Sequence, residues 1–359
     1  MSDLTTTLCG IDLRNPLILA SGPLSWSAEA IHSAFAAGAA AVVTKTIRLQ
    51  SAINPVPHIA ALKQGSMLNI EEWSDLSAEQ WIRRELPVLA ERDGVLVTSL
   101  GHTPAEVEAL AAPIMEAGTD MLEIVSYRAE DAAPMVEAAK RAVSVPVLAK
   151  VSANWHNLPE VVSACLRAGA DGIVAIDSLG PALRVDVETG QPLLGSFAWL
   201  SGAAILPIAL RAVAEICLRH DVPVVGTGGV GCTEDLVEMV MAGATAVGIH
   251  TAPLLQGLKW FGKTLARLEQ WLDERNHARL GDLRGMALPY LRTPVSHGPL
   301  TFAFDAEACS LCKRCVTVCA YEARSFTPEG QMSLDETACR SCGLCISVCP
   351  TGALSASPL

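Results

Sequence analysis

The stretch AGADGIVAI (residues 168–176) contains the pattern that decides the fold of most of this chain. A glycine in it joins the end of an Ala-rich, helix-forming segment to an apolar, β-branched run. The pattern recurs as AGAAAVV (37–43), AGTDMLEI (117–124) and AGATAVGI (242–249). A glycine after a helix-forming segment is typical of a helix C-terminus, and the apolar run that follows predicts a buried strand. We therefore predict four helix-to-strand units in this part of the chain.

Four further apolar runs bring the number of predicted strands to eight. They are LILA (17–20), VLVTS (95–99), VPVLAKV (145–151) and VPVVG (222–226). Apolar strands that alternate with helices are typical of a parallel sheet buried on both faces. Eight such units over about 260 residues predict an α/β fold of the (β/α)8 TIM-barrel type. An open, doubly wound sheet is the alternative, although no G-x-G-x-x-G follows the first strand.

Two cysteine runs with the spacing C-x2-C-x2-C-x3-C lie near the end of the chain. In proteins with two [4Fe-4S] clusters, the first three cysteines of such a run bind one cluster and the fourth binds the other. The two predicted ligand sets are Cys309, Cys312, Cys315 and Cys349, and Cys339, Cys342, Cys345 and Cys319. A disulfide framework or a zinc site is the alternative, but neither needs eight cysteines in two interlocked sets.

The length of 359 residues fits a large barrel followed by a small module. We expect the barrel over residues 1–275, an irregular linker rich in glycine and proline over 276–300, and a small α+β ferredoxin-like domain over 301–359. The turn Pro328-Glu329-Gly330 predicts a hairpin between the two cysteine runs.

The net charge of −12 argues against a nucleic-acid partner, because phosphate binding needs a basic surface. Residues 1–15 lack the apolar segment of a signal peptide, and no run of about 18 apolar residues predicts a membrane span. Cysteines that bind iron–sulfur clusters must stay reduced, as they do in a reducing compartment, so we expect a cytoplasmic protein. The oligomeric state is left open, with a homo-oligomer as one option.

Polar residues at the predicted strand ends indicate where the chemistry lies, because TIM barrels carry their sites there. Lys45 and Lys150 end two buried strands, and a buried lysine needs a partner. We expect both to face an anion in the barrel mouth; an ion pair with a barrel carboxylate is the alternative. Gly228, Gly229 and Thr251 follow the last two strands, where barrels bind phosphate. Phosphate at the rim and negative charge at the centre predict FMN, whose reduced form a lysine would stabilise.

Several segments together resemble the dihydroorotate/dihydropyrimidine dehydrogenase family, and within it the bacterial NAD-dependent dihydropyrimidine dehydrogenases. In chain order they are NPLILASGPLSWSAEAI, VVTKTI, MLNIEEW, AGTDMLEI, VPVLAKVSAN, AGADGIVAIDS, SGAAILPIALRAV and GTGGV. The resemblance covers residues 8–255 and, through the bacterial two-cluster ferredoxins, residues 301–359.

The resemblance implies binding roles at the positions that match the family. The implied FMN-binding residues are Ser21, Lys45, Thr46, Lys150, Gly202, Gly228, Gly229, His250 and Thr251. Ala20, Ser99 and Thr227 lie at ends of the same strands, and we expect them in the same site. Asn69 matches a substrate-binding asparagine, and the strand-end residues Asn154, Asp177 and Ser178 are further candidates for substrate binding.

The chain departs from the family where the substrate binds. After strand 4 the family has an Asn-x-x-Cys-Pro motif, or one with Ser for Cys, whereas this chain has Val125 and Arg128 at about those positions. A guanidinium does not release its proton, so Arg128 cannot replace the family's acid. Tyr127 and Asp177 are the remaining candidates for catalysis. We therefore expect a retained cofactor site and a substrate other than dihydroorotate or a pyrimidine.

These observations predict an oxidoreductase that acts on CH-CH or CH-NH groups through FMN. Electrons would pass through the two clusters, and the expected chemistry is reduction of an activated C=C or C=N bond, because such clusters have low potentials. The expected electron partner is an NAD(P)H–flavin reductase subunit or a soluble ferredoxin. The alternative is an electron-transfer or assembly subunit whose flavin barrel is not itself catalytic.

Overall fold

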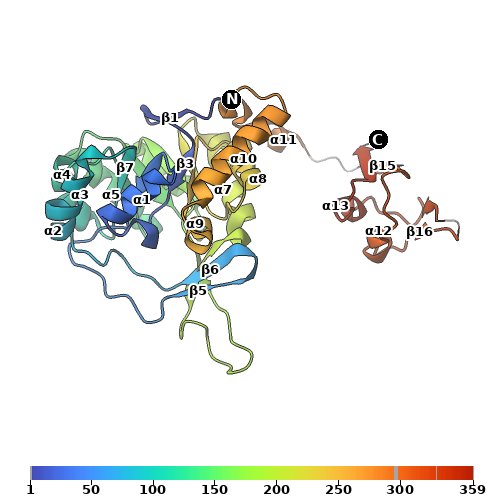
Figure 1. The fold of residues 1–359 in the computed structure, drawn as a ribbon, viewed down its shortest axis with the longest axis horizontal. Helices are drawn as coiled ribbons and strands as arrows, with labels where there is room; N and C mark the ends of the chain where they lie inside the picture. Colours follow the sequence, from blue (N-terminus) through green and yellow to red (C-terminus); the bar gives the residue numbers. More distant parts are fainter. Residues whose placement is uncertain (1, 295–297, 329, 359) are drawn as a thin grey trace. The chain divides into compact units, whose positions relative to one another are not determined.

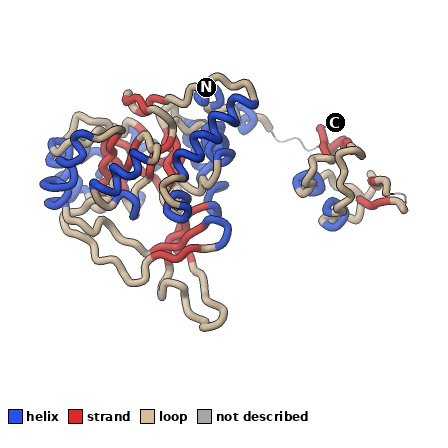
Figure 2. Tube along the Cα trace, in the orientation of Figure 1, coloured by secondary structure: helices blue, strands red, loops and turns tan. Residues whose placement is uncertain are grey.

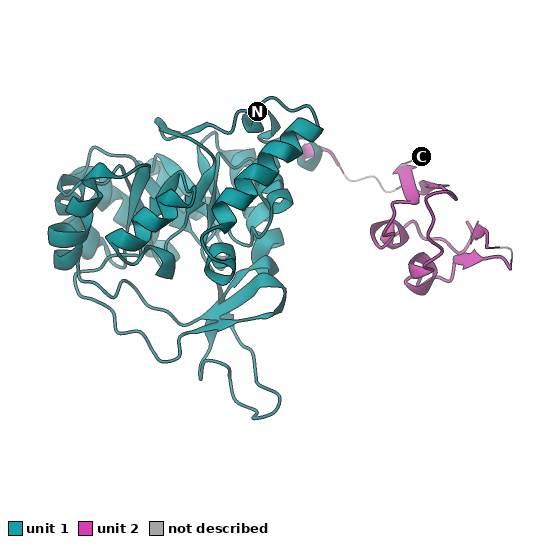
Figure 3. Cartoon of the chain, viewed as in Figure 1, with its two compact units in different colours: residues 1–291 teal, residues 292–359 magenta. Residues whose placement is uncertain are grey.

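The computed structural model of the protein describes residues 2–294, 298–328 and 330–358. Its chain divides into two compact units, Met1–Leu291 and Arg292–Leu359, which we call the barrel unit and the cluster unit (Figure 3). Within the described residues, no helix is both long enough and apolar enough to cross a membrane.

A closed barrel of eight strands forms the centre of the barrel unit (Figure 1). In chain order the strands are β3 (Leu17–Leu19), β4 (Ala41–Val43), β7 (Val95–Gly101), β8 (Met121–Val125), β9 (Val147–Val151), β10 (Gly172–Ala175), β13 (Val224–Thr227) and β14 (Ala246–Ile249). All neighbouring pairs are parallel, and β14 pairs with β3 to close the barrel. The predicted TIM barrel is confirmed, and the doubly wound alternative is wrong because an open sheet would leave two free edges.

Helices cover the outside of the barrel (Figure 2). They are α1 (Ala28–Ala36), α2 (Ala78–Gln80), the π-helical turn η3 (Trp81–Glu85), α3 (Leu86–Val88), α4 (Pro104–Glu116), α5 (Ala129–Ala142), α6 (Leu158–Arg167), α7 (Leu206–Arg219), α8 (Thr233–Met241), α9 (Thr251–Gln256) and α10 (Trp260–Glu274). Short 3-10 turns are η1 (Pro23–Ser25), η2 (Lys63–Gly65), η4 (Leu89–Glu91) and η5 (Ala203–Ile205). Gly38, Gly118, Gly169 and Gly243 follow α1, α4, α6 and α8 with left-handed backbone, as the repeated AG pattern predicts.

A β-hairpin closes the bottom of the barrel, and the sequence analysis did not predict it. Strands β1 (Thr6–Leu8) and β2 (Ile11–Leu13) form an antiparallel pair. The hairpin buries Leu8 and Leu13 against side chains that point into the barrel, among them Val97. The N-terminal end of the barrel is therefore sealed by apolar packing.

A four-stranded antiparallel sheet, which we call the added sheet, was also not predicted. Its strands are β5 (Ile59–Ala61), β6 (Ser66–Asn69), β11 (Leu179–Ala182) and β12 (Ala198–Gly202), in the order β11-β12-β6-β5. Figure 1 shows β5 and β6 outside the barrel, beside α9. The strands come from insertions after β4 and β10, so that two distant segments meet beyond the strand ends.

The predicted linker is wrong in its first part. Residues 276–291 belong to the barrel unit and form the 3-10 turn η6 (Leu280–Leu283) and most of α11 (Leu288–Arg292). Leu280 and Leu283, three residues apart, are both buried, and the N–H of Gly285 donates to the carbonyl of Val240 in α8. The packing of Leu280 and Leu283 against the barrel unit orders this segment, although its glycines and prolines predict an irregular linker. Residues 295–297 of the predicted linker lie outside the described residues.

The cluster unit consists of short elements around the cysteines. They are β15 (Leu300–Phe304), α12 (Arg314–Thr317), β16 (Arg324–Phe326), β17 (Met332–Leu334), α13 (Leu344–Ser347) and β18 (Leu354–Pro358). Strands β15 and β18 pair, and β16 and β17 form the predicted hairpin. Glu329 of the predicted turn lies outside the described residues.

We predict that Leu283→Ala lowers the free energy of unfolding of the barrel unit by about 2 to 5 kcal/mol, because it opens a cavity in a buried site. Thermal and urea unfolding, followed by circular dichroism, measure this change. Leu291→Ala is the matched control: Leu291 is 59% exposed, and its truncation should change stability by less than about 0.5 kcal/mol. Equal effects of the two substitutions would contradict the assignment of η6 to the barrel core.

Candidate active site and cluster-binding sites

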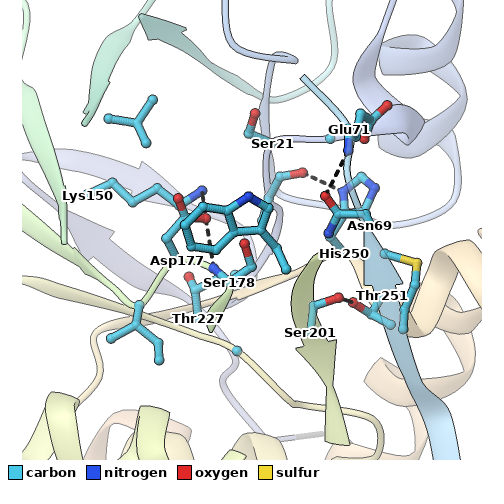
Figure 4. A pocket seen from close by; sticks show the side chains of 18 of the residues that line it. Ser21, Asn69, Glu71, Lys150, Asp177, Ser178, Ser201, Thr227, His250 and Thr251 are labelled. Atoms are coloured by element: carbon cyan, nitrogen blue, oxygen red, sulfur yellow. Dashed lines mark hydrogen bonds and ion pairs between the residues drawn. The ribbon is translucent and has the colours of Figure 1, made fainter. Parts of the chain in front are cut away.

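The C-terminal ends of the barrel strands surround a pocket with about 1100 Å³ of space, part of it open to solvent. The added sheet contributes to its wall through β6 and β12. Most of the predicted site residues line this pocket, and Figure 4 shows several of them. They are Ala20, Ser21, Lys45, Thr46, Asn69, Tyr127, Lys150, Asp177, Ser178, Gly202, Thr227, Gly228, Gly229, His250 and Thr251.

Two predicted site residues do not line the pocket. Asn154 is exposed in the turn after β9, where its N–H donates to Oγ of Ser152 (3.2 Å). Contrary to the prediction, the structure does not bring Asn154 to the substrate region, because the chain turns away at Ser152. Ser99 is fully buried and reaches the pocket only through Thr46, whose Oγ1 lies 2.9 Å from its Oγ.

Lys150, near the end of β9, is buried in the pocket, where its side chain lies beside that of Asp177 (Figure 4). Two carboxylates lie near its amino group. Its Nζ lies 3.8 Å from Oε1 of Glu123 and 3.5 Å from Oδ1 of Asp177. Burial by itself lowers the pKa of Lys150, but the charges of Asp177 and Glu123 outweigh burial and raise this pKa above its ordinary value. Lys150 therefore keeps its positive charge. Asp177 also accepts a hydrogen bond from the N–H of Ser178 (2.9 Å).

Glu123 ends a row of hydroxyl groups that begins at the pocket wall. Oγ of Ser99 donates to Oε1 of Glu123 (3.0 Å). Because the Ser99 proton is used there, the hydroxyl of Thr46 donates to Ser99, and Ser21 Oγ lies 3.3 Å from Thr46 Oγ1. Burial raises the pKa of Glu123, against the opposing effects of Lys150 and Ser99. The sequence analysis did not predict a role for Glu123. The one local feature that could have indicated a role is the presence of a single carboxylate within an apolar strand.

Lys45 follows β4 and is paired with two carboxylates from the segment after β6. Its Nζ lies 2.8 Å from Glu71 Oε1 and 2.6 Å from Asp75 Oδ2. Although burial acts in the opposite direction, the bonds from Lys45 and Asn54 hold the pKa of Asp75 below its ordinary value. Both predicted lysines thus face carboxylates of this chain, which is the alternative that the sequence left open.

The other side of the pocket offers polar atoms without partners. Nδ1 of His250 lies 2.8 Å from the carbonyl oxygen of Ala20; a carbonyl only accepts, so Nδ1 carries the proton. Burial lowers the pKa of His250 to about 4, so the ring is neutral. Nε2 of His250 and Oγ1 of Thr227 are buried and have no hydrogen-bond partner among the described residues. At Gly229, with a φ of +89°, a Cβ would lie 2.5 Å from the N atom of Leu206.

These features fit a nucleotide cofactor such as FMN. Buried polar atoms in native proteins are almost always hydrogen-bonded, so Nε2 of His250 and Oγ1 of Thr227 are suited to bond a ligand. Gly228 and Gly229, both with positive φ, let backbone N–H groups approach a phosphate closely. Thr251, the first residue of α9, lines the same pocket.

Three aromatic rings form a stack at the pocket edge that the sequence analysis did not predict. The ring centroid of Tyr127 lies 4.8 Å from that of Trp73 and 5.5 Å from that of Trp199, and the latter pair is nearly parallel. Burial and the charge of Asp177 raise the pKa of Tyr127, so its phenol stays protonated. The rings come from three distant segments, and no local sequence pattern indicates that they meet.

Directly after β8, the titratable side chain that lines the pocket is that of Tyr127. Val125, which the resemblance places at about the position of the family's asparagine, is buried in the pocket wall. Arg128 pairs instead with Glu130 (2.6 Å) and Asp131 (3.4 Å) and does not line the pocket.

Each predicted cysteine set lines its own cavity in the cluster unit. One cavity is lined by Cys309, Cys312, Cys315 and Cys349, and the other by Cys319, Cys339, Cys342 and Cys345. All eight cysteines are free of disulfides, so the disulfide alternative is wrong. In the part of the chain that the structure describes, no three possible ligands converge on a single metal ion. A cubane cluster does not require this, because each cysteine binds a different iron atom.

The polar barrel pocket and the cysteine-lined cavities in one chain define an iron–sulfur oxidoreductase. Comparison with protein families agrees: the family "Dihydroorotate dehydrogenase" matches residues 3–272, and the "4Fe-4S dicluster domain" matches residues 308–353. The chain belongs to the dihydroorotate dehydrogenase family.

Curated relatives support this assignment. The chain is 31% identical over 299 residues to the dihydroorotate dehydrogenase B (NAD(+)) catalytic subunit of Methanothermobacter thermautotrophicus, covering 79% of this chain and 98% of the relative. The protein of the same description from Pyrococcus abyssi is 32% identical over 306 residues, with 79% and 99% covered. About a fifth of this chain thus lies outside each of these alignments.

We predict that Lys45→Met destabilises the barrel unit by about 3 to 5 kcal/mol, because it leaves the carboxylates of Glu71 and Asp75 without a counter-charge in a site where Lys45 is only 5% exposed. Denaturant unfolding at neutral pH measures the loss. Arg83→Met is the matched control, since Arg83 pairs with Glu79 on the surface and such pairs contribute at most about 1 kcal/mol.

The loss should depend on pH. The pKa of Asp75 is lowered in the folded state, so its contribution is present above the ordinary value of 3.8 and disappears as the pH falls through the lower folded value. The stability difference between the wild-type protein and Lys45→Met should therefore shrink below about pH 4. A difference that grows on acidification would contradict this pairing.

Proposed function

We propose that this protein is an FMN- and iron–sulfur-dependent oxidoreductase with two [4Fe-4S] clusters. The clusters would connect an external electron carrier to FMN in the barrel, where a hydride moves to or from a small organic substrate. The observation that carries the proposal is the presence, in one chain, of two cavities with four cysteines each and a barrel pocket with unpaired buried polar atoms.

The residues that match the family's cofactor site would contact different parts of the cofactor. His250, Thr227 and the two glycines after β13 would bind the phosphate side through unpaired polar atoms and backbone N–H groups. Lys150 supplies a fixed positive charge, because Asp177 and Glu123 keep it protonated. FMN, when bound, would supply hydride transfer, and a positive charge beside its pyrimidine ring favours reduction.

The charge of the substrate side argues against dihydroorotate or orotate as the substrate. Glu71, Glu72 and Asp177 line the pocket, and the two lysines near them are already paired with carboxylates of the chain. A bound carboxylate would meet uncompensated negative charge and would lose hydration without gaining a partner. A neutral substrate with N–H donors, or a cationic one, would find acceptors instead.

The side chains around this region favour a flat substrate. The stacked rings of Tyr127 and Trp199 provide an apolar wall that suits planar and cationic groups. Oδ1 of Asn69 accepts from the N–H of Glu71 (3.3 Å), so the amide NH2 of Asn69 remains available to a substrate acceptor. The proposed direction is reduction of an activated C=C or C=N bond, as expected for low-potential clusters.

We assign to Asp177 the main role in substrate binding and in proton transfer. The neighbouring Ser178 would contribute to substrate binding. Asp177 lies next to Lys150, and as a carboxylate it can hold an N–H group of the substrate in place. Tyr127 keeps its proton and can donate a hydrogen bond, but its raised pKa makes it a weak acid. The apolar Val125 favours the second candidate function, in which the barrel transfers electrons without turning over a substrate of its own.

The proposed electron partner is an NAD(P)H–flavin reductase subunit or a soluble ferredoxin. The relatives are described as the catalytic subunit of an NAD(+)-dependent enzyme, which implies at least one other subunit for those proteins. A comparable subunit would suit this chain.

Anaerobically purified protein should contain about eight irons and one FMN per chain, as two complete cysteine sets and one nucleotide site require. Iron and sulfide analysis, together with chromatography of the released flavin, measure these contents. About four irons, or FAD in place of FMN, would contradict the proposed cofactors.

We predict that Asp177→Asn slows substrate reduction by about 10²-fold or more, because it removes the acceptor that orients the substrate. The measurement mixes pre-reduced holoprotein with orotate, uracil or N-methyl-3,4-dihydroisoquinolinium and follows flavin reoxidation at the flavin absorbance band. We expect the cation to react and orotate not to react, and we expect uracil, a pyrimidine, to react more slowly than the cation. Tyr127→Phe should slow the reaction by less than about tenfold.

Reduction of the flavin through the clusters serves as the control, and it should survive in both variants. If Tyr127→Phe abolished the reaction while Asp177→Asn did not, the two roles would be exchanged. If wild-type protein reduced orotate fastest, the substrate charge argument would be wrong. If none of the probes reacted although electrons reached the flavin, the electron-transfer function would be favoured.

A further inference from the structure

The two halves of the cluster unit repeat each other, and the repeat pairs Arg324 with Leu354. Each of these residues lies five positions after the last cysteine of its run, Cys319 or Cys349, and each follows an alanine. Both side chains are buried, with 4% and 3% exposed. A buried leucine needs no explanation in an apolar core, whereas a buried arginine requires a partner for its charge.

The contacts of Arg324 leave part of its guanidinium free. Arg324 begins β16 and lines the cavity that contains Cys319, Cys339, Cys342 and Cys345, whereas Leu354 lines the other cavity. The guanidinium lies over the ring of Phe302, 4.7 Å from its centroid, which fixes its position. Nη2 of Arg324 is buried and has no hydrogen-bond partner among the described residues. A buried donor of this kind is expected to have an acceptor that the protein itself does not provide.

The charge of Arg324 also acts outside this cavity. The positive charge of Arg324 lies close enough to Cys315 to act on it. Cys315 belongs to the other ligand set, so a charge at Arg324 affects both cluster sites. The free Nη2 and the position in the wall of the second cavity make the effect there the larger one.

A cluster with four thiolates is negatively charged, and its reduction adds one electron and one more negative charge. Its reduction potential depends on net charge, on hydrogen bonds to sulfur and on exposure to solvent. A guanidinium always carries its proton and offers several N–H donors, so Arg324 can supply both the charge and the hydrogen bonds. Burial keeps that charge from being screened by water and salt.

We propose that Arg324 is an internal counter-cation for the cluster bound by Cys319, Cys339, Cys342 and Cys345, and that it gives this cluster the higher reduction potential of the pair. This inference rests on the proposed function, since it requires both clusters. One electron from the external carrier would then reside mainly on the second cluster, and the first would be the stronger reductant.

The test is a redox titration of the full-length, anaerobically purified protein, followed by electron paramagnetic resonance of the reduced clusters. Cys342→Ser and Cys312→Ser replace equivalent, exposed ligands in the two runs, and so assign each signal to one set. Arg324→Leu introduces the residue that occupies the paired position, and Arg324→Lys keeps the charge. Arg340→Leu is the matched control, because Arg340 lines the same cavity but is exposed and donates to the carbonyl of Thr337.

We expect two separate potentials in the wild-type protein, the higher of which is altered by Cys342→Ser. Arg324→Leu should shift the reduction equilibrium of that cluster by at least tenfold toward the oxidised form, about 59 mV for one electron, and should shift the other less. Arg324→Lys should retain most of the wild-type separation, and Arg340→Leu should shift neither cluster by as much.

Equal shifts of both clusters, or no shift, in a fully loaded Arg324→Leu protein would overturn the inference. If the Arg324→Leu protein lost its clusters, the signals of the wild-type protein would still test the inference. The inference would be overturned if the higher-potential signal were altered by Cys312→Ser and left intact by Cys342→Ser. A wild-type protein with only about four irons would instead contradict the proposed cofactors, so the two failures are distinguishable by iron analysis.

Discussion

The pairing of the first barrel strand with the last is the constraint on which the rest of the barrel unit depends. Strand β3 pairs with β14, and the N–H of Ala20 donates to the carbonyl oxygen of Ile249 (3.0 Å) just beyond the paired residues. Closure brings all eight strand ends into one ring, so that side chains from strands far apart in sequence face a common space. The seam itself contributes to the site, because the carbonyl of Ala20 fixes the ring of His250 and leaves its Nε2 free for a ligand.

Charge balance is the second constraint, and it explains why two lysines can be buried in one pocket. Each lysine has two carboxylates, Glu71 and Asp75 for Lys45, and Glu123 and Asp177 for Lys150. A buried charge without such partners would lose several kcal/mol of hydration. The pairing leaves the substrate side acidic rather than basic. The proposed preference against an anionic substrate rests on the same carboxylates that stabilise the lysines.

The fold of the barrel could be predicted from the sequence because its signals are local. A glycine at a helix end and an apolar run directly after it, as at Gly169 and Ile173, depend on a few neighbouring residues. The added sheet could not be predicted in this way, because β6 and β12 are short and are stabilised by each other across a long separation in sequence. Leu280 and Leu283 were misassigned to a linker for the same reason, since their partners lie in a distant helix.

The candidate site shows the same division. Strand-end positions such as Lys150 and Thr227 follow from barrel geometry, so the sequence could place them in the mouth. Which atoms they bond could not be predicted, because the partners of Lys150 depend on the side-chain directions of Glu123 in β8 and of Asp177 just after β10. For Asn154, the position a few residues after a strand did not predict a place in the pocket. A turn at Ser152 directs Asn154 to solvent.

The proposed cofactor half and the proposed substrate half of the pocket are built from different kinds of atoms, which would allow one to be retained while the other changes. The cofactor half uses backbone that only glycine can adopt, as at Gly229, where any side chain would collide with Leu206. A substitution there would change the path of the chain itself. The substrate half uses side chains that leave the backbone unaltered, such as Val125 at the end of β8. Substitutions at such positions alter the charge and shape of the pocket without disturbing the barrel, so membership of the family fixes the cofactor site more firmly than the substrate.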